Sequence, residues 1–235
     1  MNTPHPIIVL ISANTEWRSV LNLLRPEETG ATPFGGIFSA QSGQHNLLFA
    51  HSGWGKTATA AACQHLIDSY HPRLIINLGT CGGLEGHAQV GEVLLAEETA
   101  MYDVVESMSG YAAALERYRT RADLSWLPDA FPQGVRKARI VSADQDIQTQ
   151  NYDLIADIFQ APAADWESAA FAWTAAKNKT RWLILRGVSD LVSKEKSEAY
   201  HNVQLWRERT GQIMADLLTL LPWFLDRFSN EKETA

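Results

Sequence analysis

The chain has 235 residues, of which 46% are hydrophobic and 20% charged, a composition typical of an ordinary globular protein with one sizeable core. Its formal net charge of −7, without any run of Lys and Arg, argues against a protein that binds the phosphate backbone of nucleic acids. We therefore expect a single domain over residues 1–235 and no nucleic-acid partner, although a nucleoside is not excluded as a ligand.

The amino-terminal stretch MNTPHPIIVLIS lacks the basic start and the cleavage site of a signal peptide. Its apolar run is too short to span a bilayer. The two cysteines, Cys63 and Cys81, have no CxxC spacing for zinc and are too few for a disulfide framework. We expect a cytoplasmic protein with reduced thiols and no membrane partner.

Continuous apolar runs predict strands that are covered on both faces, as in an α/β sheet. These runs span residues 6–12, 46–51, 73–79, 92–98, 138–143 and 181–188. Stretches with helical periodicity lie at 14–25, 56–70, 151–160, 166–178 and about 197–228, the last interrupted by Pro222. The alternation predicts an α/β fold with a mixed or parallel sheet between helices. Residues 103–135 are the least regular segment, and we expect a mobile loop there.

The stretch AHSGWGKTATAAA at 50–62 passes from a strand into a helix and resembles a phosphate-binding P-loop. However, that loop requires a glycine five places before Gly55, where Ala50 stands. No predicted strand ends in the acidic residue that would hold magnesium. A nucleotide triphosphatase is therefore the weakest of the functions considered, and a tight turn with a solvated Lys56 is the structural alternative.

The stretch IINLGTCGGLEG at 75–86 places glycines where a strand ends. Glycine lets the backbone turn sharply and approach a ligand closely. A tight structural loop explains this pattern as well as binding does.

The stretch LILRGVSDLV at 183–192 carries Arg186, Ser189 and Asp190 at the end of an apolar strand, and Glu167 in ADWESAA lies at a predicted strand-to-helix junction. Buried unpaired charges there would cost several kcal/mol. Each residue alone could belong to a structural ion pair. Two carboxylates, an arginine and two glycine turns at strand ends together favour a functional site, because open α/β sheets bind ligands at this edge.

These motifs, in this order, resemble those of the nucleoside phosphorylase and nucleosidase superfamily, and most closely the methylthioadenosine/S-adenosylhomocysteine nucleosidase branch. The matching stretches are SGWGKTATAAA, IINLGTCGGL, VGEVLLAEE, RIVSADQDI, DWESAA and LRGVSDLV. The resemblance covers most of the chain and implies an α/β/α sandwich around a mixed central sheet. It also implies a homodimer or higher homo-oligomer.

The resemblance implies a role for each matching residue. Asp190 would protonate the purine, Ser189 would orient Asp190, and Glu167 would hold the ribose hydroxyls. Arg186 and Glu16 would position and activate the attacking water. The remaining contacts to the sugar, the base and the 5′ side would come from Thr80, Cys81, Gly82, Trp166, Trp54, Ile147 and Asp146.

Two positions depart from the family pattern. An ungapped count from Ala13 places Trp17, and not Glu16, at the position of the water-activating glutamate. Asp146, in SADQD, stands where the family has an apolar or aromatic residue stacked on the purine. A carboxylate there puts the usual adenine pocket in doubt.

The leading prediction is an N-glycosidase that hydrolyses a purine nucleoside or related N-riboside to free base and sugar, without a metal or organic cofactor. A phosphorylase of the same fold is the nearest alternative, and a nucleoside-binding protein that has lost catalysis comes next. The phosphorylases have an arginine two residues before the first glycine of the GTCGG-like loop, where this chain has Asn77. A neutral amide grips phosphate more weakly than a guanidinium, so water is the predicted nucleophile.

Overall fold

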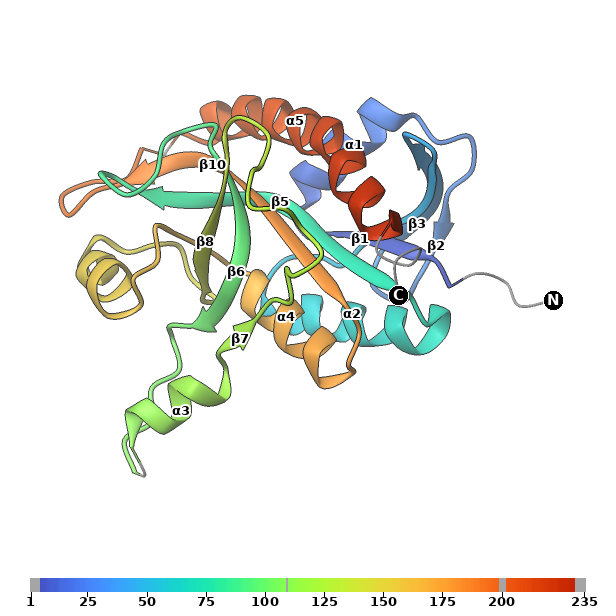
Figure 1. Cartoon of the computed structure of the whole chain (residues 1–235). Helices are drawn as coiled ribbons and strands as arrows, with labels where there is room; N and C mark the ends of the chain where they lie inside the picture. The colour runs from blue at the N-terminus through green and yellow to red at the C-terminus, as the bar shows by residue number, and fades with distance from the viewer. Residues whose placement is uncertain (1–4, 109, 199–201, 231–235) are drawn as a thin grey trace.

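The computed structural model describes residues 5–108, 110–198 and 202–230 (Figure 1). The described strands are β1 (Ile7–Ile11), β2 (Gly30–Ala31), β3 (Gly36–Ser42), β4 (His45–His51), β5 (Leu74–Leu84), β6 (Val93–Met101), β7 (Thr120–Arg121), β8 (Val135–Ser142), β9 (Ala163–Asp165) and β10 (Trp182–Val192). The described α-helices are α1 (Asn14–Leu24), α2 (Lys56–Tyr70), α3 (Tyr111–Arg117), α4 (Ser168–Lys177) and α5 (Val203–Asn230). A 3₁₀ turn, η1 (Thr149–Asn151), and a π-helical turn, η2 (Leu154–Ile158), complete the order.

The described strands form one mixed sheet in the order β10-β6-β8-β9-β5-β1-β4-β3-β2, with β7 paired to β6. β1 pairs in parallel with β4 and β5, whereas β3 and β4 form an antiparallel hairpin. β10 pairs with both β5 and β6, so the β10-β6-β8-β9-β5 part of the sheet closes on itself. The long strands β5 and β10 therefore belong to both the open sheet and this closed part.

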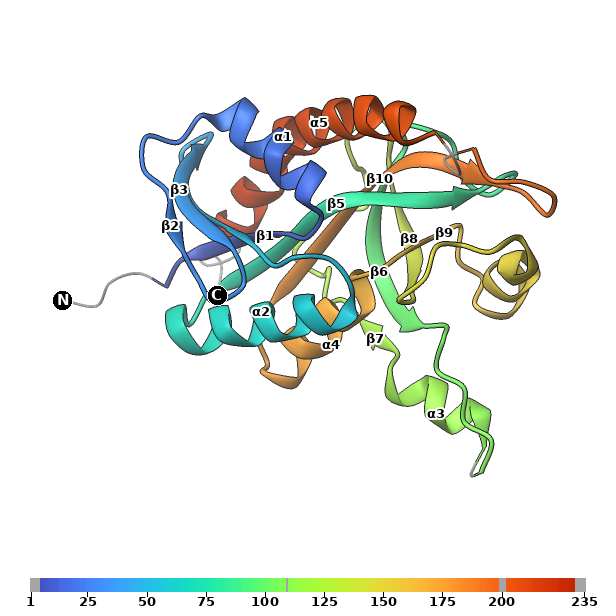
Figure 2. The ribbon, with the colours of Figure 1, turned by 180° about the vertical axis from the view of Figure 1, so that it is seen from behind.

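Helices cover both faces of the sheet, as the two opposite views show (Figures 1 and 2). α1 and α5 lie on one face, where Val20, Leu217 and Phe224 join the strand core. α2 and α4 lie on the other face, where Cys63 and Phe171 are buried. β1 is buried along its whole length because its side chains alternate between these two cores. The predicted α/β fold with a mixed sheet between helices is confirmed.

The predicted strands all occur, together with several others that have no signal in the sequence. β3, one of these, alternates between buried and exposed residues at the edge of the sheet. It has no continuous apolar run, which is the pattern that predicted the other strands. β2, β7 and β9 have only two or three residues each, too few for a periodic pattern.

Two helical predictions need correction. Residues 151–160 contain helical turns, η1 and η2, in place of a regular α-helix. α5 begins at Val203 and continues through Pro222, although proline removes one backbone donor. Buried side chains after Pro222, including Phe224 and Phe228, hold the last turns on the core. Residues 199–201 of the predicted helix lie outside the described residues.

The segment 103–135, where we expect a mobile loop, contains the short helix α3 and the strand β7. α3 projects away from the rest of the molecule (Figure 1). Of the helices that the structure describes, none is both long and apolar enough to cross a membrane.

β10 contains a bulge where its charged residues lie. Val188 pairs with Cys81 and Asp190 pairs with the next residue, Gly82, so Ser189 is an extra residue without a partner in β5. In a regular strand, neighbouring side chains point to opposite faces. A bulge re-aims them, and Ser189 and Asp190 both face the same cavity.

Candidate active site

A cavity of about 380 Å³ lies at the carboxyl ends of the parallel strands β1, β5 and β10. Every predicted site residue except Arg186 lines it: Glu16, Trp54, Thr80, Cys81, Gly82, Asp146, Ile147, Trp166, Glu167, Ser189 and Asp190. The lining also includes Ala13, Gln145, Ala164, Asp165, Val192, Ser197 and Trp206, which the sequence did not indicate. Residues predicted from separate motifs are thus brought together.

Glu16 faces the cavity from the first turn of α1. Its Oε1 accepts hydrogen bonds from the N–H (2.6 Å) and the hydroxyl (2.8 Å) of Thr80, and its Oε2 accepts one from the N–H of Ala13 (3.1 Å). Trp17 points instead into the core, where its ring packs against Phe38. The structure therefore places Glu16, and not Trp17, in the position of a cavity carboxylate. Burial raises the pKa of Glu16, and the Arg186 charge opposes this shift.

Arg186 lies behind the cavity wall with only 1% of its surface exposed. Its Nε donates to Asp165 (2.5 Å) and its Nη2 donates to the side-chain oxygen of Asn77. A Cβ on Gly79 would stand 2.6 Å from Arg186 Nη1 and 2.9 Å from Glu16 Oε1. Gly79 is thus required because the guanidinium and the carboxylate both approach its backbone.

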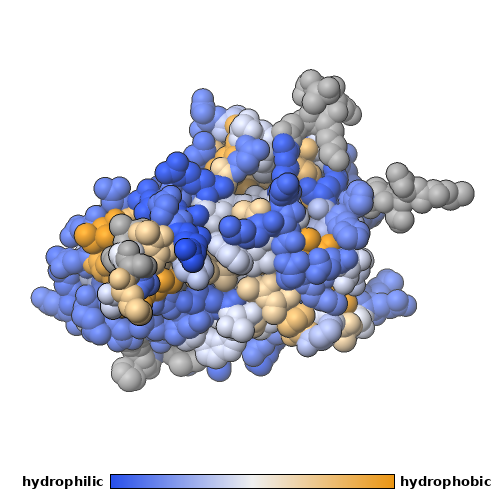
Figure 3. All heavy atoms as spheres, turned by 90° about the horizontal axis from the view of Figure 1, so that it is seen from below, coloured by the Kyte–Doolittle hydropathy of each residue, from blue (hydrophilic) through white to orange (hydrophobic). Residues whose placement is uncertain are grey.

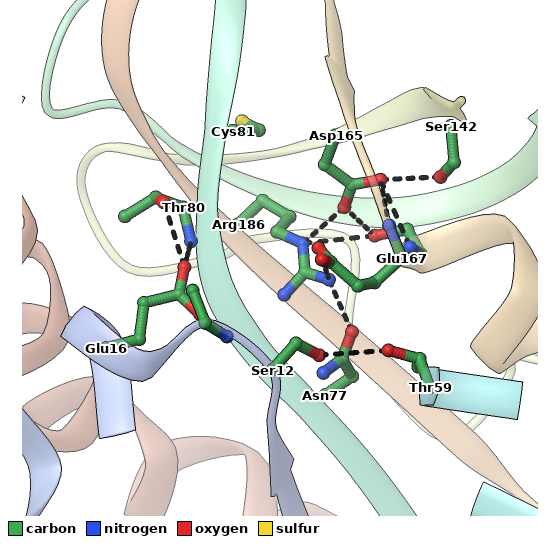
Figure 4. A network of polar contacts seen from close by, with 12 residues as sticks. Ser12, Glu16, Thr59, Asn77, Thr80, Cys81, Ser142, Asp165, Glu167 and Arg186 are labelled. Carbon is green, nitrogen blue, oxygen red and sulfur yellow. Dashed lines mark hydrogen bonds and ion pairs between the residues drawn. The ribbon is translucent and has the colours of Figure 1, made fainter. Parts of the chain in front are cut away.

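Asp165 is the buried partner of Arg186 (Figure 4). Its Oδ1 accepts from the Ser142 hydroxyl (2.5 Å) and from the N–H groups of Glu167 (3.2 Å) and Ser168 (3.1 Å). Its Oδ2 accepts from Ser168 Oγ as well as from Arg186. Asp165 therefore fixes both the guanidinium and the start of α4. Asp165 was not among the predicted site residues, although it lies in the same ADWESAA stretch as Glu167.

Glu167 immediately precedes α4, at the predicted strand-to-helix junction. Its Oε1 accepts a 2.9 Å hydrogen bond from the N–H of Gly55, and its Oε2 lies 4.0 Å from Arg186 Nη2. Burial, with the neighbouring Asp165 charge, raises the pKa of Glu167 to about 8. The surroundings of Glu167 thus favour its protonated form in the free protein.

Asp190 presents a buried carboxyl to the cavity. Ser189 donates to its Oδ1 over 2.6 Å and lies near the Cys81 carbonyl oxygen at 3.2 Å. Burial raises the pKa of Asp190, and the hydrogen bond from Ser189 opposes this shift. The guanidinium of Arg186 binds Asp165 and not Asp190. Asp190 thus has the environment of a carboxylic acid that retains its proton above the ordinary range.

Two indole rings stack at the cavity rim. The ring centroids of Trp54 and Trp166 are 5.3 Å apart, with 30° between the planes, and 64% of Trp54 is exposed. Trp166 precedes Glu167, and Trp54 precedes the Gly55 that donates to Glu167. The pair therefore lies beside the Glu167 carboxyl.

Asp146 and Ile147 line the cavity from the loop after β8. Asp146 is exposed, and Ile147 is buried. A Cβ on Gly82 would stand 2.9 Å from Ile147 Cδ1 and 3.8 Å from Asp190 Oδ2. Gly82 thus leaves room for Ile147 to approach the carboxyl of Asp190.

The glycine turn before α2 already holds two carboxylates of the protein itself. The N–H of Gly55 donates to Glu167, and the N–H of Lys56 donates to Asp144 (2.8 Å). Lys56 forms an ion pair with Asp103 at 2.5 Å and is largely buried. The expected solvated lysine is therefore wrong. The backbone donors that a P-loop would offer to phosphates are occupied, which opposes a nucleotide triphosphatase.

A family model described as the phosphorylase superfamily matches residues 7–219. The chain belongs to the phosphorylase superfamily. This confirms the family predicted from the order of the motifs.

Relatives in this superfamily include a 5′-methylthioadenosine/S-adenosylhomocysteine nucleosidase from Psychromonas ingrahamii, 27% identical over 192 residues, which are 72% of this chain and 79% of that protein. One from Tolumonas auensis is 26% identical over 168 residues, 66% of this chain and 73% of that protein. The Streptococcus pneumoniae nucleosidase structure with 8-aminoadenine has a TM-score of 0.78 at 21% identity, covering 92% of this chain and 98% of that one. The Streptococcus pneumoniae structure therefore shares the fold described above.

Proposed function

We propose that this chain is an N-glycosidase that hydrolyses a purine nucleoside or related N-riboside to free base and sugar. The nucleosidase names of its relatives support this class of reaction. The observation that carries the proposal is the lining of the cavity. It contains carboxyl groups, hydroxyl groups and indole rings, and no Lys or Arg among the described residues.

The acid in this proposal is Asp190. A purine anion is a poor leaving group, and its departure becomes easier when the base is protonated. The raised pKa of Asp190 keeps a proton available, while Ser189 fixes the direction of the carboxyl. Gly82 and Ile147 lie next to this carboxyl and form the wall for the base.

The sugar in this proposal lies between Glu167 and Glu16. Its hydroxyls bind Glu167, and Trp166 and Trp54 cover its 5′ side, while Thr80 and Cys81 line the opposite wall. As the base leaves, the sugar becomes positively charged, and the Glu16 carboxylate stabilises that charge more than it stabilises the neutral substrate.

The attacking water in this proposal is bound by Glu16. Thr80 and Ala13 fix the Glu16 carboxylate in one orientation. Arg186 acts through Glu16 and not on the water itself, since its guanidinium lies behind the wall. Burial raises the pKa of Glu16, and the Arg186 charge limits that rise, which favours the ionised carboxylate that a general base requires.

Hydrolysis is favoured over phosphorolysis because no free cation faces the cavity from the described residues. Arg186 is held by Asp165 and Asn77, and Asn77 is itself fully buried. A phosphate dianion in this cavity would meet carboxylates where it needs guanidinium groups.

The test is incubation with a panel of purine nucleosides in phosphate-free buffer and in buffer with phosphate, with chromatography of the products. We expect base release at the same rate in both buffers, with free sugar as the second product. A rate that rises steeply with phosphate, with a sugar 1-phosphate as product, would make the protein a phosphorylase. Binding without release of base from any nucleoside would make it a binding protein.

We also propose a homo-oligomer in the cytoplasm, with one domain per chain. Hydrophobic atoms gather on the underside of the molecule around the projecting α3 segment (Figure 3). Val105 and Met108, just before α3, are 80% and 97% exposed. Exposed apolar groups in one place favour a protein interface. Sedimentation of the wild type and of a Val105→Lys, Met108→Lys double variant tests this proposal. We expect an oligomer for the wild type and a smaller species for the double variant, and a wild-type monomer contradicts the proposal.

A further inference from the structure

Lys56, the first residue of α2, binds two carboxylates that follow other strands. Its Nζ lies 2.5 Å from each Oδ of Asp103 and 3.8 Å from Oδ2 of Asp144. The backbone N–H of Lys56 donates to Asp144 Oδ1 over 2.8 Å, and the backbone N–H of Asp144 donates to Asp103 Oδ2 over 3.1 Å. The three residues that follow β4, β6 and β8 are therefore joined in a closed network.

This network lies outside the cavity but reaches both of its walls. Gly55, which precedes Lys56, donates to the carboxyl of Glu167. Asp144 is followed directly by residues 145–147, which line the cavity. Lys56 itself is not part of the lining. The network thus connects the Glu167 wall to the loop at 144–147 without touching the cavity contents.

We propose that Lys56 is a positioning residue that sets the distance between the loop at 144–147 and Glu167. This inference rests on the proposed function, in which that loop contacts the base and Glu167 contacts the sugar. Asp190 and Glu16 come from β10 and α1, which the network does not touch. Lys56 therefore governs how tightly a nucleoside binds more than how fast its glycosidic bond breaks.

The physical reason is charge balance. One ammonium group stands between the carboxylates of Asp103 and Asp144, whose side chains are 22% and 45% exposed. Without it, the two carboxylates repel each other, and water screens this repulsion incompletely because Asp103 is partly buried. Because the N–H of Asp144 is bound to Asp103, that repulsion pulls the start of the loop out of position.

The experiment compares the steady-state kinetics of Lys56→Met and Lys56→Arg with those of the wild type on the best nucleoside substrate. We expect Lys56→Met to raise KM about tenfold and to change kcat less than about threefold. This pattern is typical of a variant that binds the substrate and the transition state more weakly by the same amount. Lys56→Arg keeps the charge and should stay within about threefold of the wild-type KM. The matched control is Lys194→Met, which removes an exposed ammonium paired with Asp153 at 2.5 Å and should change neither constant.

A second variant tests the charge-balance explanation. Asp103→Asn added to Lys56→Met removes the repulsion and keeps an oxygen acceptor for the N–H of Asp144, so KM should recover by at least about threefold. This double variant also serves if Lys56→Met does not fold. In that case, a folded double variant with a KM within about threefold of the wild-type value supports the charge-balance explanation, and a KM raised about tenfold overturns it.

Amide hydrogen exchange separates this proposal from the proposed function, because it requires no turnover. We expect faster exchange at residues 145–147 in Lys56→Met than in the wild type, with no change in Lys194→Met. If the wild type releases no base from any nucleoside, the proposed function fails and the exchange result alone decides the role of Lys56. Equal exchange in Lys56→Met and the wild type, or an equal KM, overturns the proposal.

Discussion

The hydroxyl of Ser189 donates a 2.6 Å hydrogen bond to Oδ1 of Asp190, the next residue of the same strand. If Asp190 is the general acid, Asp190→Asn should lower kcat by about 10²–10⁴, because the amide keeps the shape of the carboxyl but delivers no proton. Base release from the best nucleoside under saturating conditions measures this loss.

Two measurements make this prediction specific. Asp129→Asn, at an exposed position, should retain wild-type kcat. The circular dichroism spectrum and melting temperature of Asp190→Asn should remain close to those of the wild type. Full activity in Asp190→Asn would exclude it as the acid, and an unfolded variant would assign Asp190 a structural role.

Glu167 should matter more for the sugar than for the base. A carboxyl with two oxygens suits two neighbouring hydroxyls, so Glu167→Ala should lower kcat/KM for ribosides more than it lowers affinity for the free base. Comparison of ribosides with 2′-deoxyribosides checks this. If the wild type treats both sugars alike, Glu167 has another role.

The raised pKa of Glu167 also predicts how stability depends on pH. Its ordinary value is 4.5 and its value in the folded protein is about 8, so the folded chain binds this proton more tightly than the unfolded chain. The stabilisation is fully present below the unfolded value and is lost as pH rises through about 8. Glu16 and Asp190 shift in the same direction.

Thermal unfolding between about pH 5 and about pH 8 tests this linkage. The melting temperature of the wild type should fall over this range, and Glu167→Gln should fall less because its amide does not titrate. Glu27→Gln, at an exposed position, should follow the wild type. A wild-type melting temperature that rises steadily with pH would contradict the buried, protonated state of Glu167.

Asp146 should determine which base is accepted. A carboxylate can accept hydrogen bonds from the N–H groups of a base but offers no stacking face. We expect weak cleavage of methylthioadenosine by the wild type and an improvement in Asp146→Phe. Asp146→Ala separates the two effects, since it removes the charge without adding a ring. Efficient cleavage of methylthioadenosine by the wild type would show that Asp146 does not face the base.

The sequence predicted the central strands well because both of their faces are buried. The run at 73–79, for example, leads into β5, which pairs with β1, β9 and β10. β3 was missed since an edge strand needs only one apolar face. The predicted break at Pro222 failed because the core contacts of α5 outweigh one lost backbone hydrogen bond.

The motifs at strand ends predicted the cavity residues because parallel strands deliver their following loops to one edge. They did not predict Trp206, which reaches the cavity from α5 and lies in no motif. Asp165 was missed for a different reason. Its partner Arg186 is 21 residues away in sequence, and the pairing of strands decides which carboxylate a buried guanidinium meets.

The bulge at Ser189 makes the length of β10 as important as its chemistry. Because Ser189 is the extra residue opposite Cys81 and Gly82, deleting it would keep Asp190 in the sequence while removing the donor to its carboxyl and the kink that aims it. If Asp190 is the general acid, such a one-residue deletion should abolish base release although the aspartate is retained. Libraries with insertions and deletions in β10, as well as substitutions, would therefore include variants that bind a nucleoside but no longer release its base.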